Sequence, residues 1–130
     1  MIKGIDHIVL TVENIERSIA FYVNILNMKK EIFGKNRVAL KFGNQKINLH
    51  EQTTQTSPKS KQPTVGSMDL CFITEIPLKE VYEELLSQNI TILEGIVKRT
   101  GANGLIESLY FNDPDGNLIE LSNYVDRSQK

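Results

Sequence analysis

The stretch from Leu109 to Tyr124 reads Leu-Tyr-Phe-Asn-Asp-Pro-Asp-Gly-Asn-Leu-Ile-Glu-Leu-Ser-Asn-Tyr, and the fold of the whole chain can be inferred outward from it. Its central residues, 112–117, preset φ, tolerate positive φ or bond their own backbone, so they predict a reversal between two strands. Side chains alternate along a strand, which puts Glu120 on the opposite face from Ile119 and Leu121. A buried, unpaired carboxylate costs several kcal/mol. Glu120 is therefore either an outward-facing edge residue or part of a site that holds a cation or another partner.

The same plan occurs a second time in the chain, with a shorter turn. The run Phe-Gly-Asn-Gln-Lys-Ile-Asn-Leu, which ends at Leu49, has the same order of an aromatic residue, a polar reversal and an Ile-polar-Leu strand, so Asn48 corresponds to Glu120. The strand-and-helix pattern around His7 is repeated around Asp69. Two copies of one unit, each with polar residues at these two positions, would bring four polar groups to the pseudo-twofold axis between the copies. The repeat therefore favours a site.

Hydrophobic periodicity predicts an α+β fold of two βαβββ modules in a single domain, 1–130. Module one (2–51) is expected to have strands at 5–12, 30–33, 37–42 and 47–51 and a helix at 15–26; module two (67–124) is expected to have strands at 67–74, 91–97, 106–111 and 118–123 and a helix at 78–88. Asn14 is the predicted N-cap of the first helix, and Asn27 and Asn89 are predicted to end the two helices in the left-handed conformation. The polar segment 52–66 is the expected linker, and 125–130 is the expected tail.

Composition indicates a small globular protein without a strongly charged partner. The chain has 130 residues, a formal net charge of −1 and no basic block, which argues against nucleic acid or a membrane as a partner. No apolar run approaches the ~20 residues of a membrane span, and the residues after Met1 show no signal-peptide pattern. The single cysteine excludes an internal disulfide, so a reduced, cytoplasmic setting is expected.

Three motifs resemble the vicinal oxygen chelate superfamily, which includes glyoxalase I, bleomycin- and fosfomycin-resistance proteins, methylmalonyl-CoA epimerase and extradiol dioxygenases. They are the Asp-His-Ile-Val-Leu-Thr-Val strand at 6–12, the Phe-Tyr-x-x-x-Leu-x-Met pattern at 21–28 and the Tyr-Phe-Asn-Asp-Pro-Asp-Gly-Asn-Leu-Ile-Glu-Leu run at 110–121. The resemblance covers residues 2–124 and looks closest to glyoxalase-domain-containing, lactoylglutathione-lyase-like proteins. It implies that the two βαβββ modules form an open eight-stranded, barrel-like sheet around a divalent metal ion.

The resemblance also implies that the metal ligands come from the first and fourth strands of each module, which places His7, Asp69 and Glu120 in the ligand set. In the family's isomerases the last ligand also moves protons, so Glu120 is the first candidate for the catalytic base. Asp69 stands where most members have a second histidine, and it is either an oxygen ligand, a turn cap or a partner of His7. An oxygen in place of a nitrogen ligand shifts the preference toward harder ions, and Zn, Ni, Mn, Fe and Mg all remain candidates.

Two polar residues of module one are candidates for contacts with a substrate. Asn48 stands where glyoxalase I has Glu, and because a neutral amide is a weak metal ligand it is expected to position a water or a substrate oxygen. His50 lies on the same strand face as Asn48. It is either a catalytic base or substitute ligand, since imidazole titrates near neutrality, or a partly solvated histidine at the rim. In module two, Cys71 shares the face of Asp69 and is expected to be a small buried apolar residue.

Two classes of function agree with these residues. The first is a glyoxalase-type lyase or isomerase, in which the metal chelates two neighbouring oxygens of a small α-oxygenated substrate and stabilises an enediolate while Glu120 or His50 moves the proton. The second is a metal-free module that binds an antibiotic or another small molecule, as the bleomycin-resistance proteins do. An extradiol-type dioxygenase is a weaker alternative, because Asp69 replaces a histidine of its iron triad. The exposed sheet edges of this fold favour a homodimer.

Overall fold

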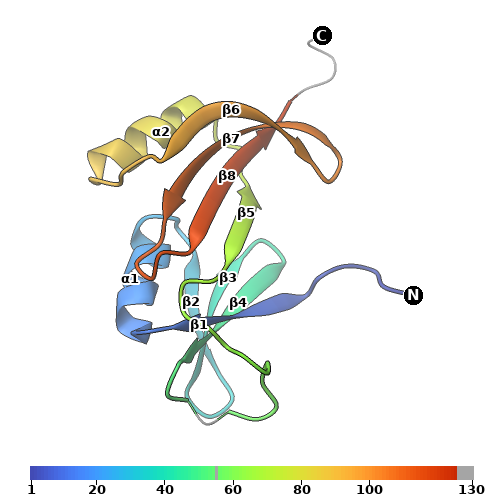
Figure 1. Cartoon of the computed structure of the whole chain (residues 1–130), viewed down its shortest axis with the longest axis vertical. Helices are drawn as coiled ribbons and strands as arrows, with labels where there is room; N and C mark the ends of the chain where they lie inside the picture. Colours follow the sequence, from blue (N-terminus) through green and yellow to red (C-terminus); the bar gives the residue numbers. More distant parts are fainter. Residues whose placement is uncertain (55, 126–130) are drawn as a thin grey trace. The chain divides into compact units, whose positions relative to one another are not determined.

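The protein is described by a computed structural model over residues 1–54 and 56–125. In this part of the chain the elements follow the order β1–α1–β2–β3–β4 and then β5–α2–β6–β7–β8 (Figure 1). The strands form two four-stranded sheets with the orders β1-β4-β3-β2 and β5-β8-β7-β6. The predicted α+β fold of two βαβββ modules is therefore confirmed, with the eight strands divided between two open sheets.

The chain divides into two compact units. Unit 1 consists of Met1–Met68 together with Pro114–Gly116, and unit 2 consists of Asp69–Asp113 and the chain from Asn117 onward. Each unit contains one module, and the predicted linker, 52–66, belongs to unit 1. Apart from Val125, the predicted polar tail lies outside the described residues. The described helices include none that is long and apolar enough to cross a membrane.

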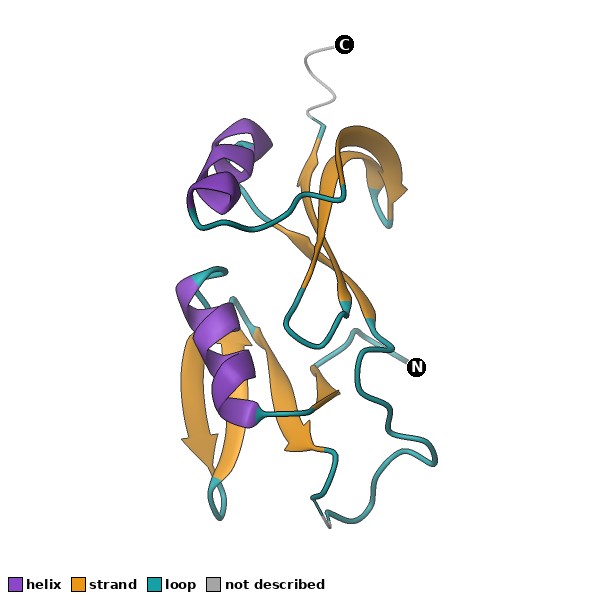
Figure 2. Ribbon diagram, turned by 60° about the vertical axis from the view of Figure 1, so that its left-hand side comes forward, coloured by secondary structure: helices purple, strands orange, loops and turns teal. Residues whose placement is uncertain are grey.

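Unit 1 is one helix on one sheet, as Figure 2 shows. The helix is α1 (Ile15–Asn24), and the strands are β1 (His7–Val12), β2 (Lys29–Phe33), β3 (Arg37–Phe42) and β4 (Gln45–Glu51). Apolar side chains of the helix and of the strands are removed from solvent together, and the completely buried ones are Leu10, Val12, Tyr22, Ala39, Leu40 and Ile47. Leu10 and Val12 are two positions apart on β1 and therefore share one face of the strand.

Unit 2 repeats this arrangement. Its helix is α2 (Leu78–Ser87), and its strands are β5 (Asp69–Ile73), β6 (Glu94–Gly101), β7 (Gly104–Asn112) and β8 (Leu118–Tyr124). Its core is formed by Leu85 of the helix and by strand residues that are almost or completely buried, namely Ile106, Leu109, Phe111, Ile119 and Leu121. The two apolar neighbours of Glu120 thus belong to the core, as the alternation along β8 predicts.

The predicted capping residues are confirmed, but both helices end earlier than expected, α1 at Asn24 instead of residue 26 and α2 at Ser87 instead of residue 88. The Oδ1 atom of Asn14 accepts a hydrogen bond from the backbone N–H of Arg17 at 2.9 Å, which satisfies one of the free donors in the first turn of α1. Asn27 and Asn89 follow the two helices with φ values of 58° and 62°. These are left-handed conformations that asparagine tolerates better than most residues.

Strand ends differ from the prediction where two strands meet in a tight turn. Phe42 pairs with Gln45, so β4 begins two residues earlier than expected. The predicted strand at 91–97 is wrong at both ends, because β6 runs from Glu94 to Gly101. Gly101 pairs with Gly104 across a two-residue turn, and the longer loop expected there is a β-hairpin. These strand ends are set by how neighbouring strands pair, and that register cannot be read from the sequence of one strand.

The strand register confirms the internal repeat. In the parallel pair β1–β4, Asn48 lies opposite the residue two positions after His7. In the parallel pair β5–β8, Glu120 lies opposite the residue two positions after Asp69. The sheet orders of the two units also correspond strand by strand. The predicted equivalence of His7 with Asp69, and of Asn48 with Glu120, therefore holds for the backbone.

The turn in the stretch from 109 to 124 is held by its own side chains. Asp113 accepts two hydrogen bonds from Asn117, one from the backbone N–H at 2.9 Å and one from the side-chain amide at 2.8 Å. Both residues are buried. Asp115, at the tip, has a fully buried side chain that accepts a hydrogen bond from Arg17 at 2.6 Å. The turn residues thus bond specific partners in addition to reversing the chain.

Candidate functional site

Glu120 lines a pocket in unit 2. The pocket has a volume of about 410 Å³ and is bordered by Cys71, Ile73, Arg99, Thr100, Gly101, Ala102, Ile106, Tyr110, Glu120 and Tyr124. Glu120 is half-buried, and β8 lies between β5 and β7 in the sheet. The interpretation of Glu120 as an edge-strand residue is therefore wrong, because its strand is an inner one.

Two side chains from neighbouring strands support the Glu120 carboxylate. Tyr110 is the register partner of Glu120, and its hydroxyl is hydrogen-bonded to that carboxylate. The same hydroxyl accepts a hydrogen bond from Nε of Arg99 at 2.9 Å. Burial raises the pKa of Tyr110, and the bond to Glu120 raises it further, while Arg99 acts in the opposite direction. Tyr110 therefore stays protonated near neutrality, with its proton directed to Glu120.

A group of hydroxyls lies beside the same carboxylate. The Oγ atom of Ser122 is 2.6 Å from Oγ of Ser108 and 3.4 Å from Oε2 of Glu120. It is also 3.3 Å from Sγ of Cys71. Both serines are completely buried. Ser122 thus connects the Glu120 carboxylate to a buried hydroxyl and to the thiol of Cys71.

Cys71 is not the buried apolar residue that the sequence predicts. It is exposed, as are Asp69 and Ile73 on the same face of the edge strand β5. Although Cys71 is exposed as a residue, partial desolvation of its thiol raises the pKa of Cys71, and the carboxylates of Glu120 and Asp69 raise it further. The thiol therefore lies within the electrostatic reach of both predicted acidic ligands. Asp69 itself does not line the Glu120 pocket.

His7 has a carboxylate partner that differs from the Asp69 partner expected from the sequence, namely its neighbour Asp6. Nδ1 of His7 lies 2.8 Å from Oδ2 of Asp6, and the His7 side chain is 43% exposed. The hydrogen bond to His7 lowers the pKa of Asp6. With Nδ1 engaged, the lone pair on Nε2 of a neutral ring is available to another partner. The adjacent Asp-His pair in the sequence was the signal that could have indicated this bond.

Asn48 and His50 are both turned away from solvent. Asn48 is 4% exposed, and its Oδ1 atom has no hydrogen-bond partner among the residues that the structure describes. His50 is half-buried, and within the described chain its Nε2 atom is likewise buried without a partner. Burial lowers the pKa of His50, and the nearby Arg37 lowers it further, so the ring is neutral near pH 7. His50 lines a pocket of unit 1 that does not include Asn48 or His7.

The predicted ligands fit a metal ion by their individual chemistry. Within residues 1–54 and 56–125, no three His, Cys, Asp or Glu side chains lie together in a way that could hold an ion. Unit 1 contains His7, and unit 2 contains Asp69 and Glu120. A carboxylate that fixes the tautomer of a histidine, as Asp6 does for His7, is the usual surrounding of a metal-binding histidine. Carboxylate oxygens such as those of Asp69 and Glu120 suit hard divalent ions.

Comparison with known proteins supports the family resemblance and the fold described above. The family model that matches is described as the Glyoxalase/Bleomycin resistance protein/Dioxygenase superfamily, and the match covers residues 4–121. The virulence protein STM3117 of Salmonella typhimurium strain LT2 is 54% identical over 125 residues, which is 96% of this chain and 87% of that protein. Its crystal structure has a TM-score of 0.94 to this chain and matches over 96% of this chain and 99% of that chain.

Two further relatives are named differently, one after its domain and one after a chemical activity. The glyoxalase domain-containing protein RDO1 of Mycosarcoma maydis is 45% identical over 125 residues, 96% of this chain and 70% of that protein. The metallothiol transferase FosB of Staphylococcus saprophyticus is 31% identical over 121 residues, 93% of this chain and 77% of that protein. The more similar of the two is thus named by its domain, and the more distant one by its chemistry.

Proposed function

Because this chain belongs to the glyoxalase/bleomycin resistance protein/dioxygenase superfamily, we propose that it is a metal-dependent enzyme of the glyoxalase type, a lyase or isomerase that acts on a small α-oxygenated substrate. The observation that carries this proposal is the position of Glu120 at a pocket, together with the hydrogen bonds to its carboxylate. Glu120 borders a pocket, and its carboxylate is held by hydrogen bonds from Tyr110 and Ser122. A general base needs this combination of access to a ligand and fixed orientation.

His7, Asp69 and Glu120 are the proposed ligands of a divalent ion, which can be Zn, Ni, Mn, Fe or Mg. The Asp6 carboxylate supports His7 in this role, because it leaves Nε2 available. An ion bound by these residues would polarise a substrate oxygen and stabilise the negative charge that develops beside it. The metallothiol transferase among the relatives is named for metal-dependent chemistry, which favours a metal here as well.

Glu120 is the proposed proton carrier. It would take a proton from the carbon next to the polarised oxygen and return it to the neighbouring carbon. The Tyr110 hydroxyl donates to the carboxylate, so it limits the rotation of Glu120 between the two transfers. His50 is the second candidate for this transfer, since its neutral ring can accept a proton. Asn48 is proposed to position a substrate oxygen or a water through its side-chain amide.

A metal-free binding protein is the second candidate function. The observation in its favour is that Ile73, Ile106 and Tyr124 border the Glu120 pocket, so an apolar ligand has surfaces to pack against. In this case Glu120 would be a polar anchor of a binding site. The two functions differ in what the charge of Glu120 contributes.

Glu120→Gln tests the proposal, because it keeps the size of the side chain and removes its charge and its ability to carry a proton. The protein would be loaded with each of the five metals in turn and assayed with α-oxygenated compounds, including the adduct of methylglyoxal and glutathione. Turnover of any compound should fall by ~10²-fold or more in Glu120→Gln. Glu107→Gln, a change of an exposed glutamate on the neighbouring strand, is the matched control and should leave turnover unchanged.

The outcome that contradicts the enzyme is equally specific. If the wild type turns over nothing with any of the metals, while calorimetry shows that wild type and Glu120→Gln bind one of the compounds equally well, the protein is a binding module. Thermal stability of both forms, measured in the same preparations, shows that the substitution has not unfolded the protein.

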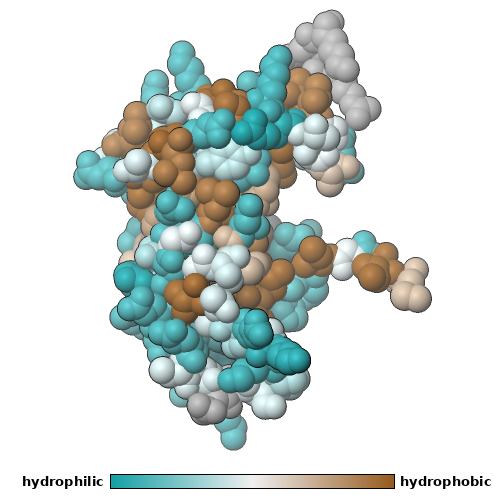
Figure 3. All heavy atoms as spheres, in the orientation of Figure 1, coloured by the Kyte–Doolittle hydropathy of each residue, from teal (hydrophilic) through white to brown (hydrophobic). Residues whose placement is uncertain are grey.

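We also propose that the protein is a homodimer. β1 and β5 lie at the ends of their sheets, and each exposes an apolar side chain, Val9 with 42% and Ile73 with 52% exposure. Exposed apolar groups also gather on the N-terminal segment, which projects from unit 1 in Figure 3. Free edges with apolar side chains favour pairing with a second chain. Sedimentation velocity should show a dimer for the wild type and a monomer for Val9→Lys with Ile73→Lys.

A further inference from the structure

The formal net charge of −1 conceals an uneven distribution of charge along the chain. Residues 1–68 contain ten Lys and Arg and five Asp and Glu, a net charge of +5, whereas residues 69–130 contain five and eleven, a net charge of −6. The first of these segments makes up nearly all of unit 1. Charge asymmetry between two parts of a chain is a signal for a charged partner. The place where the positive charge of unit 1 gathers therefore indicates what this unit binds.

Three lysines lie directly beside one another on the sheet of unit 1. Lys29 of β2 is the register partner of Lys41 of β3, and Lys41 is the register partner of Lys46 of β4. Register partners share a face of the sheet, with Cβ atoms about 5 Å apart, and like charges at such positions are destabilising. Within residues 1–54 and 56–125, no ion pair joins any of these lysines to a carboxylate. This lysine row thus contains two unfavourable pairs that a bound anion would relieve.

A fourth cation and an aromatic ring lie on the same face of the sheet. Phe33 is the register partner of Arg37, and Cζ of Arg37 is 4.7 Å from the centroid of the Phe33 ring. Nζ of Lys46 is 3.8 Å from the same centroid, so the Lys46 side chain reaches across β3. Ala39 of β3 lies between them and is completely buried, as expected beneath the stem of a lysine. The Phe33 ring therefore holds two cations in place, and the other two lysines of the row are exposed.

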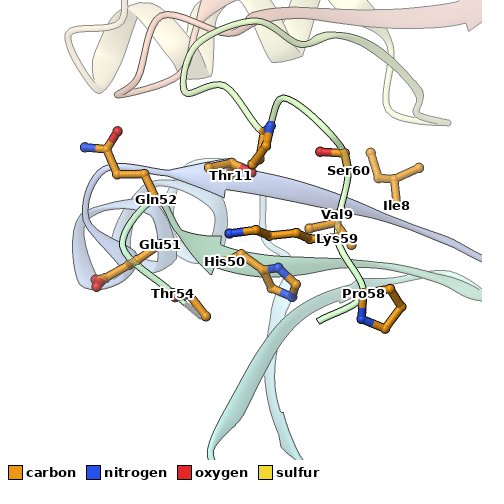
Figure 4. A pocket seen from close by; sticks show the side chains of 11 residues that line it. Ile8, Val9, Thr11, His50, Glu51, Gln52, Thr54, Pro58, Lys59 and Ser60 are labelled. Atoms are coloured by element: carbon orange, nitrogen blue, oxygen red, sulfur yellow. The ribbon is translucent and has the colours of Figure 1, made fainter. Parts of the chain in front are cut away.

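Carboxylates do not balance the charge of this face. Glu31, which is half-buried, is the one acidic residue among the strand positions on it. Asp6, which precedes β1, is bound to His7. Figure 4 shows the linker passing over the part of the face that contains His50, where Lys59 of the linker adds a further positive charge. The face is therefore positive, and the lysine row is open to solvent.

The lysine row is continuous with residues of the proposed site. Lys46 is also the register partner of His7 in the parallel pair β1–β4, and Asn48 lies two positions further along the same face of β4. We propose that the row and Arg37 bind the acidic groups of the substrate, which is therefore a small organic acid with two carboxylates. The carboxylates lie among the four cations, and the rest of the molecule extends toward Asn48. This inference rests on the proposed function for the identity of the substrate, but binding of the acid needs no metal ion.

Glutarate is a suitable probe, because it has two carboxylates and no other polar group. Its monomethyl ester carries one negative charge, and its diamide carries none. On the full chain treated with a chelator, titration calorimetry should show glutarate binding about tenfold tighter than the ester, a factor equivalent to ~1.4 kcal/mol, and no binding of the diamide. Added salt should weaken the binding of glutarate, because exposed charges are screened. In 15N-labelled protein, the side-chain amide of Asn48 should shift when glutarate is added.

Lys41→Met tests the row at its centre, because it removes one cation and both like-charge pairs. Glutarate should bind this variant about tenfold more weakly, and without ligand the variant should unfold at a higher temperature than the wild type. A residue with only a structural role would not combine lost binding with gained stability. Lys30→Met changes an exposed lysine whose side chain is on the other face of β2, so this control should bind glutarate as the wild type does. Glu31→Gln should bind glutarate more tightly, because it removes the negative charge of the face.

The results that overturn this inference differ from those that overturn the proposed enzyme. The inference is wrong if glutarate does not bind the metal-free protein, or if folded Lys41→Met binds it as tightly as the wild type. An enzyme whose turnover depends on Glu120 but which binds no dicarboxylate would keep its proposed function and lose this site. A protein that turns over nothing but binds glutarate through Lys41 would keep this site as a binding site and lose the proposed enzyme.

Discussion

Oδ2 of Asp6 lies 2.8 Å from Nδ1 of His7, the residue that follows it in the chain. The bond fixes which ring nitrogen carries the proton and directs Nε2 away from Asp6. Both side chains are accessible, at 89% for Asp6 and 43% for His7, so the pair is not a buried element of the core. An accessible histidine whose tautomer is fixed by a neighbouring carboxylate is better suited to binding a ligand than to packing.

Asp6→Asn should therefore weaken metal binding without unfolding the protein. The amide keeps the size of the side chain, but it is a weaker acceptor for the Nδ1 proton of His7. We expect the affinity for Mn or Zn to fall by about 10- to 100-fold, the range typical of losing such a partner. Competition with a chromophoric chelator measures the affinity. Glu16→Gln, an exposed charge change on α1, is the control. An Asp6→Asn protein that binds metal as the wild type does would show that Asp6 does not orient His7.

The contact between Tyr110 and Glu120 can be tested by titrating the phenol. The pKa of Tyr110 is raised because burial and the Glu120 carboxylate both oppose its ionisation. Glu120→Gln should lower this pKa toward its usual value of ~10, and Arg99→Met should raise it further, because the guanidinium favours the phenolate. Tyrosinate absorbance as a function of pH measures both shifts, with Tyr110→Phe identifying the transition. If the Tyr110 phenol titrates at the same pH in the wild type, Glu120→Gln and Arg99→Met, the hydrogen bonds that connect Arg99, Tyr110 and Glu120 do not exist in solution.

The sequence predicted the elements of the fold well because their signals are local or repeated. Asn14 caps α1 through a residue three positions away, and Asn27 and Asn89 end their helices by their own conformation. The limits of β6 could not be predicted in this way. They depend on a shift in its pairing with β7 between Gly95 and Val97, which is a property of two strands together.

The candidate site was predictable only in part for the same reason. Alternation along one strand placed Glu120 opposite the core residues of β8, and the pocket confirms that position. Tyr110 and Arg99 were missed, because their contact with Glu120 requires the register of three strands. Cys71 was assigned to the core because cysteine is a small apolar residue type, whereas its burial depends on what covers its face of β5. The pocket at His50 was missed, because a polar linker has no periodicity that would show where it folds back.

The shifted pKa of His50 predicts a pH dependence of stability. Because burial and Arg37 lower this pKa in the folded state, the unfolded chain takes up the proton first as the pH falls. The His50 contribution to the free energy of unfolding should be complete above ~6.5 and should be lost progressively as the pH falls from there toward the lower folded pKa. Urea unfolding of wild type and His50→Gln at several pH values measures this contribution as the difference between their free energies of unfolding.

Two variants separate the causes of this dependence. His50→Gln should lack the decrease, and Arg37→Gln should show a smaller decrease than the wild type, since one of the two causes has been removed. If wild type and His50→Gln lose stability in parallel between about pH 7 and 5, His50 is not responsible for the pH dependence.

The turn between β7 and β8 should be a large single contributor to the stability of unit 2. Asp113→Ala removes the acceptor of two buried hydrogen bonds from Asn117, at 2.9 and 2.8 Å, and leaves both donors without it. We expect the free energy of unfolding to fall by about 2–4 kcal/mol. Asn44→Ala, in the exposed equivalent turn of unit 1, should change it by less than ~0.5 kcal/mol.

The double variant Asp113→Ala with Asn117→Ala decides whether those bonds are the cause. When both partners are removed, the side-chain amide of Asn117 no longer lacks an acceptor, so the double variant should be less destabilised than the sum of the two single variants. Denaturant unfolding of the four proteins gives the coupling energy directly. Additive effects would mean that Asp113 and Asn117 act separately, and that the backbone preferences of Pro114 and Gly116 alone hold the reversal that begins β8.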